Sequence, residues 1–547
     1  MLPELAQRPP IYVYYDNTIE REKATKEVES DILLSWRRAW WAQGFKPIIL
    51  SPAEAMNNPM YEELQHKSEG LDAALKTDIM RWLAWENMGG GLLAHYFLFP
   101  MGAYDDPLLV YLRRNEFPGL TRWKDLGDDG LFVGPKADVA KAIKLALASP
   151  KLKTAKNFLE ATTSKEEGPF TIDDTNPSSL AYYSAATLKS LYPKVAETIG
   201  GDPVAGLKSL NELINAHLHQ TWQNLFSEGG IAVVKPLPQH TTHMIAPSYS
   251  VALRLASCPT NNPLPTSCPP NRPKCVPCST AHPVKISTPA HYQNSSSVYT
   301  IGTVPHPYTI QSLSAMREQI TVPWIRRDSV RDAWVGDLMT DLFKGKAVPA
   351  GARVLRFKEA VAGEYGSARS LWLTAERDPS ANEAILDWHF GFDLPVLPSS
   401  SSSSSSKETT AAEHDDKTEK IESEIHKPKD STILPPLHDE KEGPVPTEQD
   451  LKLEPNLLSL AKTIVASSDA EEKKNKKTAS HVTKEEIKIR EAVEAWNLAD
   501  WEAWRFARAY LARKEMEREK WAEEEEKYAG GMGSEKRGKG GGWFDSD

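Results

Sequence analysis

An aspartate and an arginine three residues apart, Asp78 and Arg81, are the side chains best suited to recognising a polar ligand. The apolar pattern around them predicts a helix over residues 70–88, and residues three apart share one face of a helix. Together they would offer a hydrogen-bond acceptor and a cationic fork to a ribose, a base or a phosphate. The alternative is that they pair with each other at the helix surface, which contributes about a few tenths of a kcal/mol.

The four cysteines of the chain, Cys258, Cys268, Cys275 and Cys278, lie close together in the sequence, and His282 follows them. Four thiolates, or three with His282, would complete a tetrahedral zinc site. In an oxidising compartment the same four residues would form two disulfides. The spacing does not distinguish a zinc site from disulfides or free thiols, and each of these would be a structural role.

Two pairs of histidines are weaker candidates for ligand binding. His217 and His219 are two residues apart in a predicted helix, so they face different sides and cannot chelate together. His240 and His243 precede a predicted loop, where they would bind a ligand or neutralise a phosphate; the alternative is solvent or core histidines. The sequence contains no Gly-x-Ser-x-Gly nucleophile turn, no phosphate-binding loop and no kinase signature. It therefore names no catalytic residue.

The elements that must position these residues are strands alternating with helices. The pattern predicts strands over residues 11–15, 46–50 and 92–99, with helices over 27–43, 52–65 and 70–88. This order predicts an α/β fold with a mainly parallel sheet flanked by helices on both faces. In such sheets ligands bind beyond the carboxyl ends of the strands, and two of these ends carry Asp16-Asn17 and His95.

Residues 76–100, KTDIMRWLAWENMGGGLLAHYFLFP, resemble a segment of the DXD-motif glycosyltransferases. In that family a helix with the pattern S/T-D-I/L-x-R leads to a Gly-Gly turn and a short apolar strand ending in Asp-x-Asp. Residues 77–81 and the pair Gly89-Gly90 match this pattern. The resemblance implies a GT-A nucleotide-diphospho-sugar transferase fold, with Asp78 and Arg81 beside the nucleotide. It also implies that the end of the first strand lines the base pocket through Tyr14, Tyr15, Asp16 and Asn17.

The chain departs from the family at the DXD motif itself, which is degenerate. Counted from the glycine pair, the two carboxylates fall on Ala94 and Tyr96; counted back from Pro100, they fall on His95 and Phe97. Both carboxylates are absent either way. In the family they hold Mn²⁺ or Mg²⁺ against the diphosphate, because hard divalent cations prefer oxygen ligands.

Asp105 and Asp106 are the residues considered as substitutes for the missing carboxylates. They would hold Mn²⁺ or Mg²⁺ if they supply the charge from a loop, and the alternative is a solvated turn. Transfer without a metal, in which His, Arg or Lys groups neutralise the leaving diphosphate, is the other route.

Composition divides the chain into segments. A run of serines ending at Ser406 and a charged stretch without aromatic residues predict disorder, because they offer little to bury. Apolar residues at helical spacing return near Thr483. The predicted segments are a glycosyltransferase-like α/β domain at 9–397 with an irregular Cys/Pro-rich insertion at 257–293, a disordered linker at 398–482, a long amphipathic helix at 483–530, and a disordered Gly-rich tail at 531–547. The helix would either dock on the folded body or bind a protein partner from its tether.

Charge and hydropathy exclude two classes of partner. The net charge of −10 argues against a protein that binds nucleic acid through its phosphates. No stretch reaches the roughly 18 apolar residues of a membrane-spanning helix, and the N-terminus has the pattern of neither a signal nor a transit peptide. As written, the chain is expected to be cytoplasmic; it would belong to the Golgi or secretory pathway if an N-terminal anchor is missing from the gene model.

These observations lead to two main hypotheses about function. The first is a glycosyltransferase-like protein that binds a nucleotide-sugar and transfers a hexose without a standard DXD metal site. The second is an inactive pseudoenzyme with the same fold, acting as a scaffold through its C-terminal helix. A third hypothesis is a zinc-stabilised interaction protein.

Overall fold

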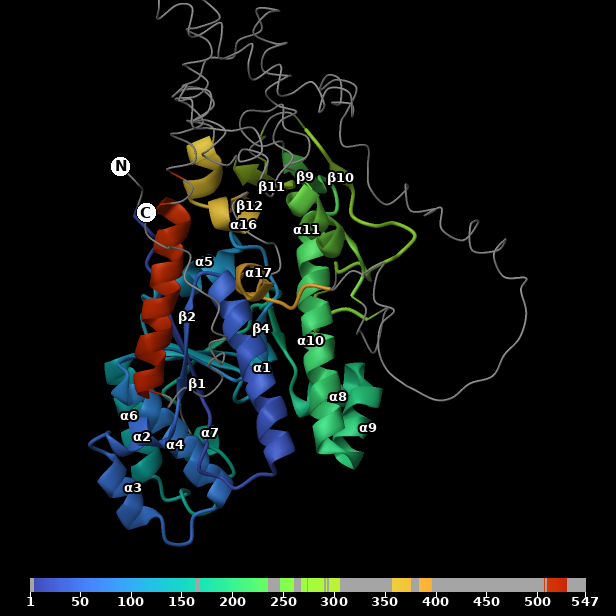
Figure 1. Ribbon diagram of the computed structural model, residues 1–547. Coiled ribbons are helices and arrows are strands. Elements are labelled where there is room, and N and C mark those ends of the chain that lie inside the picture. The colour runs from blue at the N-terminus through green and yellow to red at the C-terminus, as the bar shows by residue number, and fades with distance from the viewer. Residues whose placement is uncertain are drawn as a thin grey trace, which may run out of the picture.

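The computed structural model of the chain contains two sheets of mainly parallel strands with helices packed around them (Figure 1). It describes residues 4–162, 168–234, 246–259, 267–272, 274–289, 292, 295–304, 357–374, 383–395, 506 and 509–528. The expected linker at 398–482, the tail at 531–547 and the pair His240 and His243 lie outside these residues, as does the first part of the predicted helix at 483–530.

The larger sheet has six strands in the order β2-β1-β3-β6-β5-β7. Its strands are β1 (Pro10–Tyr14), β2 (Lys46–Leu50), β3 (Gly90–Ala94), β5 (Thr121–Trp123), β6 (Leu131–Pro135) and β7 (Thr171–Asp173). Only β6 runs against its neighbours, being antiparallel to both β3 and β5. The predicted mixed α/β fold with a mainly parallel sheet and flanking helices is confirmed.

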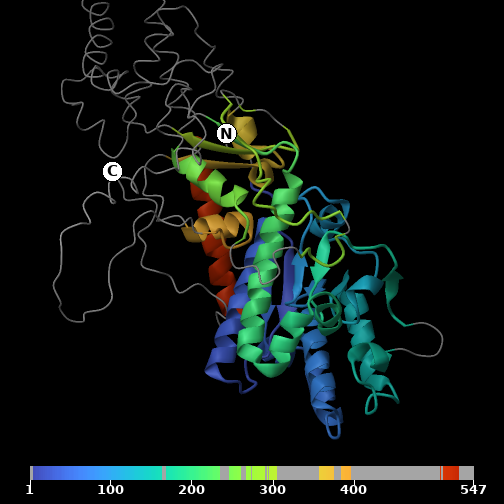
Figure 2. The ribbon, with the colours of Figure 1, turned by 90° about the vertical axis from the view of Figure 1, so that its right-hand side faces the viewer.

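Alternating side chains of the strands face two separate cores. Ile11 and Val13 of β1 pack on one face, while Tyr12 and Tyr14 pack on the other, as the two-residue period of a strand requires. The first face is covered by α1 (Lys23–Ala42) and α10 (Pro203–Leu225). The second is covered by α2 (Pro52–Met56), α4 (Ala73–Asn87) and α6 (Lys136–Ala148). Figure 2 shows α1 and α10 together on their side of the sheet.

A second sheet of four parallel strands, in the order β10-β9-β11-β12, was not expected from the sequence. Its strands are β9 (Ile231–Val234), β10 (Ile286–Ser287), β11 (Tyr299–Val304) and β12 (Ser370–Thr374). The remaining helices are α3 (Tyr61–Lys67), α5 (Pro107–Arg114), α7 (Phe158–Thr162), α8 (Ala185–Leu191), α9 (Pro193–Gly201), α11 (Ala246–Ala256), α16 (Gly366–Arg369) and α17 (Glu383–Phe390). In the described part of the chain, no helix combines the length and hydropathy needed to cross a bilayer.

The glycine-rich turn after α4 determines how β3 enters the sheet. All three glycines of the turn have positive φ, and Gly90 has φ +80°. A Cβ on Gly90 would lie 2.6 Å from the carbonyl oxygen of Gly134 and 2.7 Å from the backbone nitrogen of Lys136. Only glycine therefore allows β3 to pair with β6 at this point.

The predicted continuous strand over residues 92–99 is wrong, because the chain turns in its middle. The N–H of Leu98 donates to the carbonyl of His95, and the N–H of Phe97 donates to Nδ1 of the His95 ring. These bonds end β3 at Ala94 and begin β4 (Leu98–Pro100), which pairs with β8 (Leu180–Tyr182) in a separate two-stranded sheet. The turn leaves His95 and Tyr96 half-buried at the end of β3.

The helix over residues 509–528 packs against α1 and the outer edge of β2 (red in Figure 1). The indole N–H of Trp521 donates to the carbonyl of Pro47 in β2 at 3.2 Å, and its ring lies 5.0 Å from that of Trp41. Arg37 and Glu525 form a buried ion pair beside it. This helix covers the edge strand of the sheet, which would otherwise present unpaired backbone groups.

Candidate functional site

A cavity of about 420 Å³ lies beyond the carboxyl ends of β1 and β3. Its walls come from β1, α4, the turn after β3, the loop before β6 and the segment before α7. The lining residues are Val13, Tyr14, Ala74, Thr77, Asp78, Arg81, Ala94, His95, Tyr96, Asp128, Asp129, Lys156 and Asn157. The structure therefore brings Asp78, Arg81 and His95 to one cavity, at the end of the sheet where the sequence predicts a ligand.

Asp78 and Arg81 lie one turn apart on α4, on the wall of the cavity. Oδ1 of Asp78 is 3.8 Å from Nε of Arg81, and Oδ2 accepts a hydrogen bond of 2.8 Å from the N–H of Phe158. Asp78 thus holds the start of α7 in place, together with the preceding Lys156 and Asn157. The Arg81 guanidinium lies 5.3 Å from the centre of the Phe132 ring, and its buried Nε has no hydrogen-bond partner among the described residues.

His95 presents a neutral ring to the cavity. Burial lowers its pKa to about 4; Arg81 adds to this effect and Asp129 opposes it. Because Nδ1 accepts the N–H of Phe97 at 3.1 Å, the neutral ring carries its proton on Nε2. That nitrogen lies 4.0 Å from Oδ2 of Asp129. At neutral pH His95 is therefore a hydrogen-bond donor toward the cavity rather than a cation or a base.

Asp128 and Asp129, in the loop before β6, add two carboxylates to the cavity wall. Oδ1 of Asp129 accepts a hydrogen bond of 2.6 Å from the Tyr182 hydroxyl, whose pKa is raised by burial and by Asp129 itself. Asp128 is more exposed and lies 3.7 Å from Arg122. Asp129 is thus oriented by the two-stranded sheet that β8 forms with β4.

The cavity combines cations with carboxylates in a small volume. Arg81 and Lys156 are positive, Asp78, Asp128 and Asp129 are negative, and His95 is a neutral donor. Such a wall suits a polar ligand that carries both anionic groups and hydroxyls, because cations bind the former and carboxylates accept from the latter.

Comparison with models of protein families assigns the chain to a family. The family model of DUF8765, a domain of unknown function, matches residues 1–546. The chain belongs to the DUF8765 family. Neither curated proteins nor solved structures yield a match to it.

Three residues assigned to the base pocket by the sequence lie apart from the cavity of this DUF8765 protein. Tyr15 points to the opposite face of β1 from Tyr14, and its hydroxyl donates to Glu29 at 2.5 Å. The carboxylate of Asp16 accepts from the backbone N–H and the hydroxyl of Thr18. Neither these residues nor Asn17 lines the cavity. Of the four degenerate DXD positions, Ala94, His95 and Tyr96 line it; the fourth, Phe97, packs against the core.

Asp105 and Asp106 do not replace the missing carboxylates. Asp106 caps α5 by accepting from the N–H groups of Leu108 and Leu109, and Asp105 pairs with Arg369 at 2.7 Å. Neither residue lines the cavity. Their carboxylates satisfy the start of a helix and a contact with a later segment of the chain.

The residues at the cavity do not form a ready-made site for the divalent cation that the family resemblance implies. Ala94 and Tyr96 supply no carboxylate. Asp129 is engaged by Tyr182 and faces His95. Across the described residues, no group of three His, Cys, Asp or Glu side chains could hold a metal ion.

The four cysteines form two disulfides, Cys258–Cys278 and Cys268–Cys275. The carbonyl of Cys268 also accepts the hydroxyl of Tyr192, and this ties the insertion to the helices below it. His282, the alternative zinc ligand, takes no part in these pairs. His217 and His219 of α10 are buried and bonded to Tyr183 and to the carbonyl of Leu255, respectively.

The sequence reasoning missed Asp128, Asp129, Lys156 and Asn157. The cause is the direction of β6: an antiparallel strand starts where its parallel neighbour ends, and Leu131 of β6 pairs with Ala94 of β3. The sequence predicts a mainly parallel sheet and does not mark β6 as an exception; were β6 parallel to β3, the loop before it, with Asp128 and Asp129, would lie at the far end of the sheet. The paired aspartates between Gly127 and Gly130 were the available signal.

Proposed function

We propose that the chain is a glycosyltransferase-like protein that binds a nucleotide-sugar in the cavity at the ends of β1 and β3, and transfers a hexose without a DXD-bound metal ion. One observation carries the proposal: Asp78 and Arg81 of α4 line a single cavity with His95, which lies beyond the end of β3. Had they lain in separate places, the resemblance of residues 76–100 to the DXD glycosyltransferases would have no functional content.

The size of the cavity supports this ligand class. Small-molecule sites occupy roughly 300–1,000 Å³ and combine apolar walls with a few polar groups. The cavity of about 420 Å³ has Tyr14 and Tyr96 as aromatic surfaces and Arg81 as its least exposed cation. Aromatic rings can stack on a base or a sugar ring, while a guanidinium fits a phosphate.

The chemistry proposed for the leaving diphosphate depends on the protein's own groups. Arg81 and Lys156 would neutralise its charge, and Nε2 of His95 would donate a hydrogen bond to it. Asp129 remains as a hydrogen-bond acceptor for a sugar or acceptor hydroxyl. No step of this proposal passes through a metal ion.

Calorimetric titration with UDP, GDP and their sugar conjugates, in EDTA and then in Mn²⁺, tests the proposal. We expect saturable binding of at least one nucleotide in EDTA. Arg81→Ala should weaken it by about ten- to a hundredfold, which corresponds to losing a hydrogen bond to a charged group. Arg114→Ala is the matched control, because Arg114 is exposed at the end of α5 and should leave the affinity unchanged.

Three outcomes of this titration are informative. No binding of any nucleotide by the folded chain would overturn the proposal. Binding that requires Mn²⁺ and is lost in Asp129→Asn would replace the metal-free route by one in which the loop before β6 supplies the cation ligands. Binding in the titration, together with no transfer to any acceptor in an activity assay, would favour the second candidate, a pseudo-glycosyltransferase. The absence of both DXD carboxylates is the observation behind this candidate.

The scaffold role considered for that pseudoenzyme must take account of the C-terminal helix. In the described part of this helix, Tyr510 and Trp521 are buried against the body of the same chain. A partner protein that used these aromatic side chains would have to displace the helix first.

A further inference from the structure

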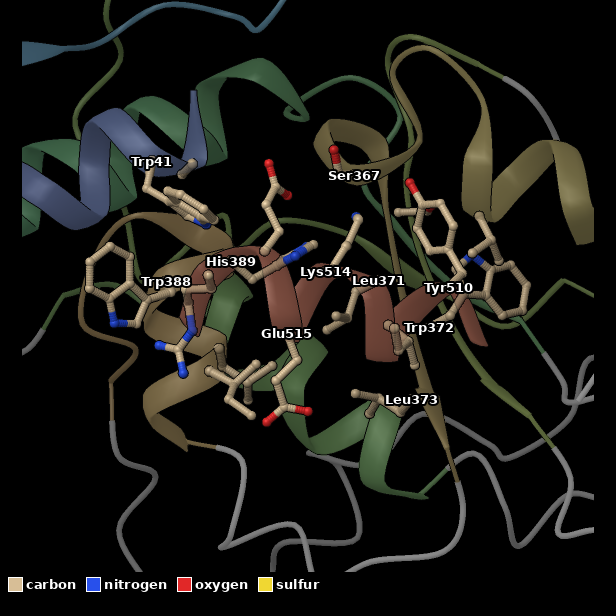
Figure 3. A pocket seen from close by; sticks show the side chains of 18 of the residues that line it. Trp41, Ser367, Leu371, Trp372, Leu373, Trp388, His389, Tyr510, Lys514 and Glu515 are labelled. Carbon is tan, nitrogen blue, oxygen red and sulfur yellow. The ribbon is translucent and has the colours of Figure 1, made fainter. Parts of the chain in front are cut away.

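A second cavity, of about 170 Å³, lies where the helix over residues 509–528 meets α1, β12 and α17 (Figure 3). Its walls are largely apolar and aromatic. The apolar lining residues include Trp41, Leu371, Trp372, Leu373, Leu386 and Trp388. This cavity is built from a different part of the molecule than the candidate nucleotide site and shares no lining residue with it.

A single lysine enters this apolar cavity. Figure 3 shows Lys514 extending from the helix into the space between Trp41 and Tyr510. Its amine lies 4.8 Å from the centre of the Tyr510 ring. Among the described residues, Lys514 has no hydrogen bond and no ion pair, and its side chain is half-buried.

The other charged groups around Lys514 are already satisfied. Arg8 pairs with Glu517 at 3.3 Å and donates to the carbonyl of Trp41 at 2.6 Å. Nε2 of His389 bonds to the hydroxyl of Tyr299 at 2.8 Å. Glu517, the nearest carboxylate on the same helix, is therefore committed to Arg8. Glu515 and Arg518, which also line the cavity, have interactions of their own. Of the described lining residues, Lys514 is therefore the cation without an ion pair, although Glu517 lies near enough to act on it electrostatically.

Burial of an unpaired ammonium is unfavourable, so the protein either neutralises it or supplies an anion. Burial, together with the positive charge of Arg8, lowers the pKa of Lys514 to about 8 while Glu517 opposes the shift. The amine is therefore still mostly charged at neutral pH. A second donor in the wall, the indole N–H of Trp372, also has no partner among the described residues.

We propose that this cavity binds a small organic carboxylate, whose apolar body packs between the tryptophans and whose carboxylate pairs with Lys514. A cavity of about 150 Å³ accommodates one benzene ring, so the volume of about 170 Å³ fits one ring or a short chain of similar size. The ligand would bridge the C-terminal helix, β12 and α17. Phosphate or a sugar fits less well, because the walls offer apolar surface and only one free cation in the described lining.

Fluorine NMR titration of the full-length chain with para-fluorobenzoate tests this site. We expect saturable binding to the wild type and markedly weaker binding of the neutral para-fluorobenzamide. Lys514→Met removes the charge, keeps an unbranched side chain of similar length, and should weaken benzoate binding about tenfold or more. Lys520→Met is the matched control on the same helix, where Lys520 is exposed, and should bind as the wild type does.

The pH dependence of the wild type gives a second measurement that requires no variant. As long as the pH stays above the range in which the benzoate itself is protonated, affinity should be constant below the Lys514 pKa of about 8 and fall as pH rises above it, because the amine loses its charge. His389 is neutral over this range, since burial lowers its pKa to about 3. Absence of saturable benzoate binding, or equal binding by wild type and Lys514→Met, would overturn the proposal.

Discussion

The candidate nucleotide site and the cavity around Lys514 are built from the chain in opposite ways. The candidate nucleotide site is polar, and all of its lining residues lie between Val13 and Asn157. The pocket around Lys514 is apolar, and its walls come from segments as far apart as Arg8 and Arg518. In this protein the polar site is formed at the ends of the strands of one sheet, whereas the apolar pocket forms only when segments far apart in the chain pack together.

This difference has an energetic origin. At the candidate nucleotide site the backbone is fixed by strand pairing, so charged groups such as Arg81 are held without being fully buried. At the pocket the positions of Trp41, Trp388 and Trp521 depend on contacts among their rings. Burial of aromatic surface therefore stabilises the second region, and removal of one ring should disturb it most.

The largest expected effect is at the contact between the C-terminal helix and the body. Trp521 is 3% exposed, so Trp521→Ala should lower the free energy of unfolding by about 3–5 kcal/mol. Met516→Ala on the same helix, where the side chain is 59% exposed, should change it by less than about 0.5 kcal/mol. Urea unfolding measures both. If Trp521→Ala also abolished nucleotide binding in the folded protein, the two regions would not be independent.

A smaller effect is expected in the turn that leads into the nucleotide site. Gly90→Ala places a Cβ against the backbone of β6, and should cost about 1–3 kcal/mol beyond the strain of a positive φ. Gly89→Ala is the control, since Gly89 has φ +99° but no atom within 4 Å of its Cβ. The difference between the two variants in urea unfolding isolates the clash. If Gly90→Ala and Gly89→Ala had the same free energy of unfolding, the backbones of β3 and β6 would lie farther apart at Gly90 than in the structure.

The last expected effect is a pH dependence that both cavities share, and its size depends on the pH at which stability is measured. Burial lowers the pKa of His95 to about 4 and that of His389 to about 3, from an ordinary value of 6.5. Between pH 6.5 and the lowered pKa of each ring, the histidine binds a proton in the unfolded chain but not in the folded one. Within that window the free energy of unfolding falls with falling pH by about 1.4 kcal/mol per unit for each group. His95→Asn and His389→Asn should each make the slope of unfolding free energy against pH shallower. A slope unchanged in either variant would show that the ring is protonated in the folded state.

Much of the first region could be predicted from the sequence. The apolar runs of β1 and β2, and the spacing of Trp36 and Trp40 in α1, are local patterns that strand and helix periods explain. The face shared by Asp78 and Arg81 follows from the same helical period. The glycine turn correctly indicated where α4 ends and a buried strand begins.

The parts that could not be predicted depend on how elements pair in space. The turn at His95 that separates β3 from β4 occurs within an apolar stretch, where nothing in the local pattern marks it. The antiparallel direction of β6, which brings Asp129 to the cavity, is a property of the sheet and leaves no local signal. The four-stranded second sheet joins strands separated by long stretches of chain, which periodicity does not relate to one another.

By itself, the sequence determined the first strands and helices, such as β1, β2 and α1, and that Asp78 and Arg81 would share one face of α4, because these follow from residue spacing of a few positions. The tertiary structure decided the rest: that Asp129 lies beside His95, that the cysteines pair as two disulfides, and that Lys514 enters a largely apolar pocket without an ion pair among the described residues. Each of these depends on the distance between residues far apart in the chain, which is fixed only when the cores on the two faces of the sheet and the helix at its edge pack together.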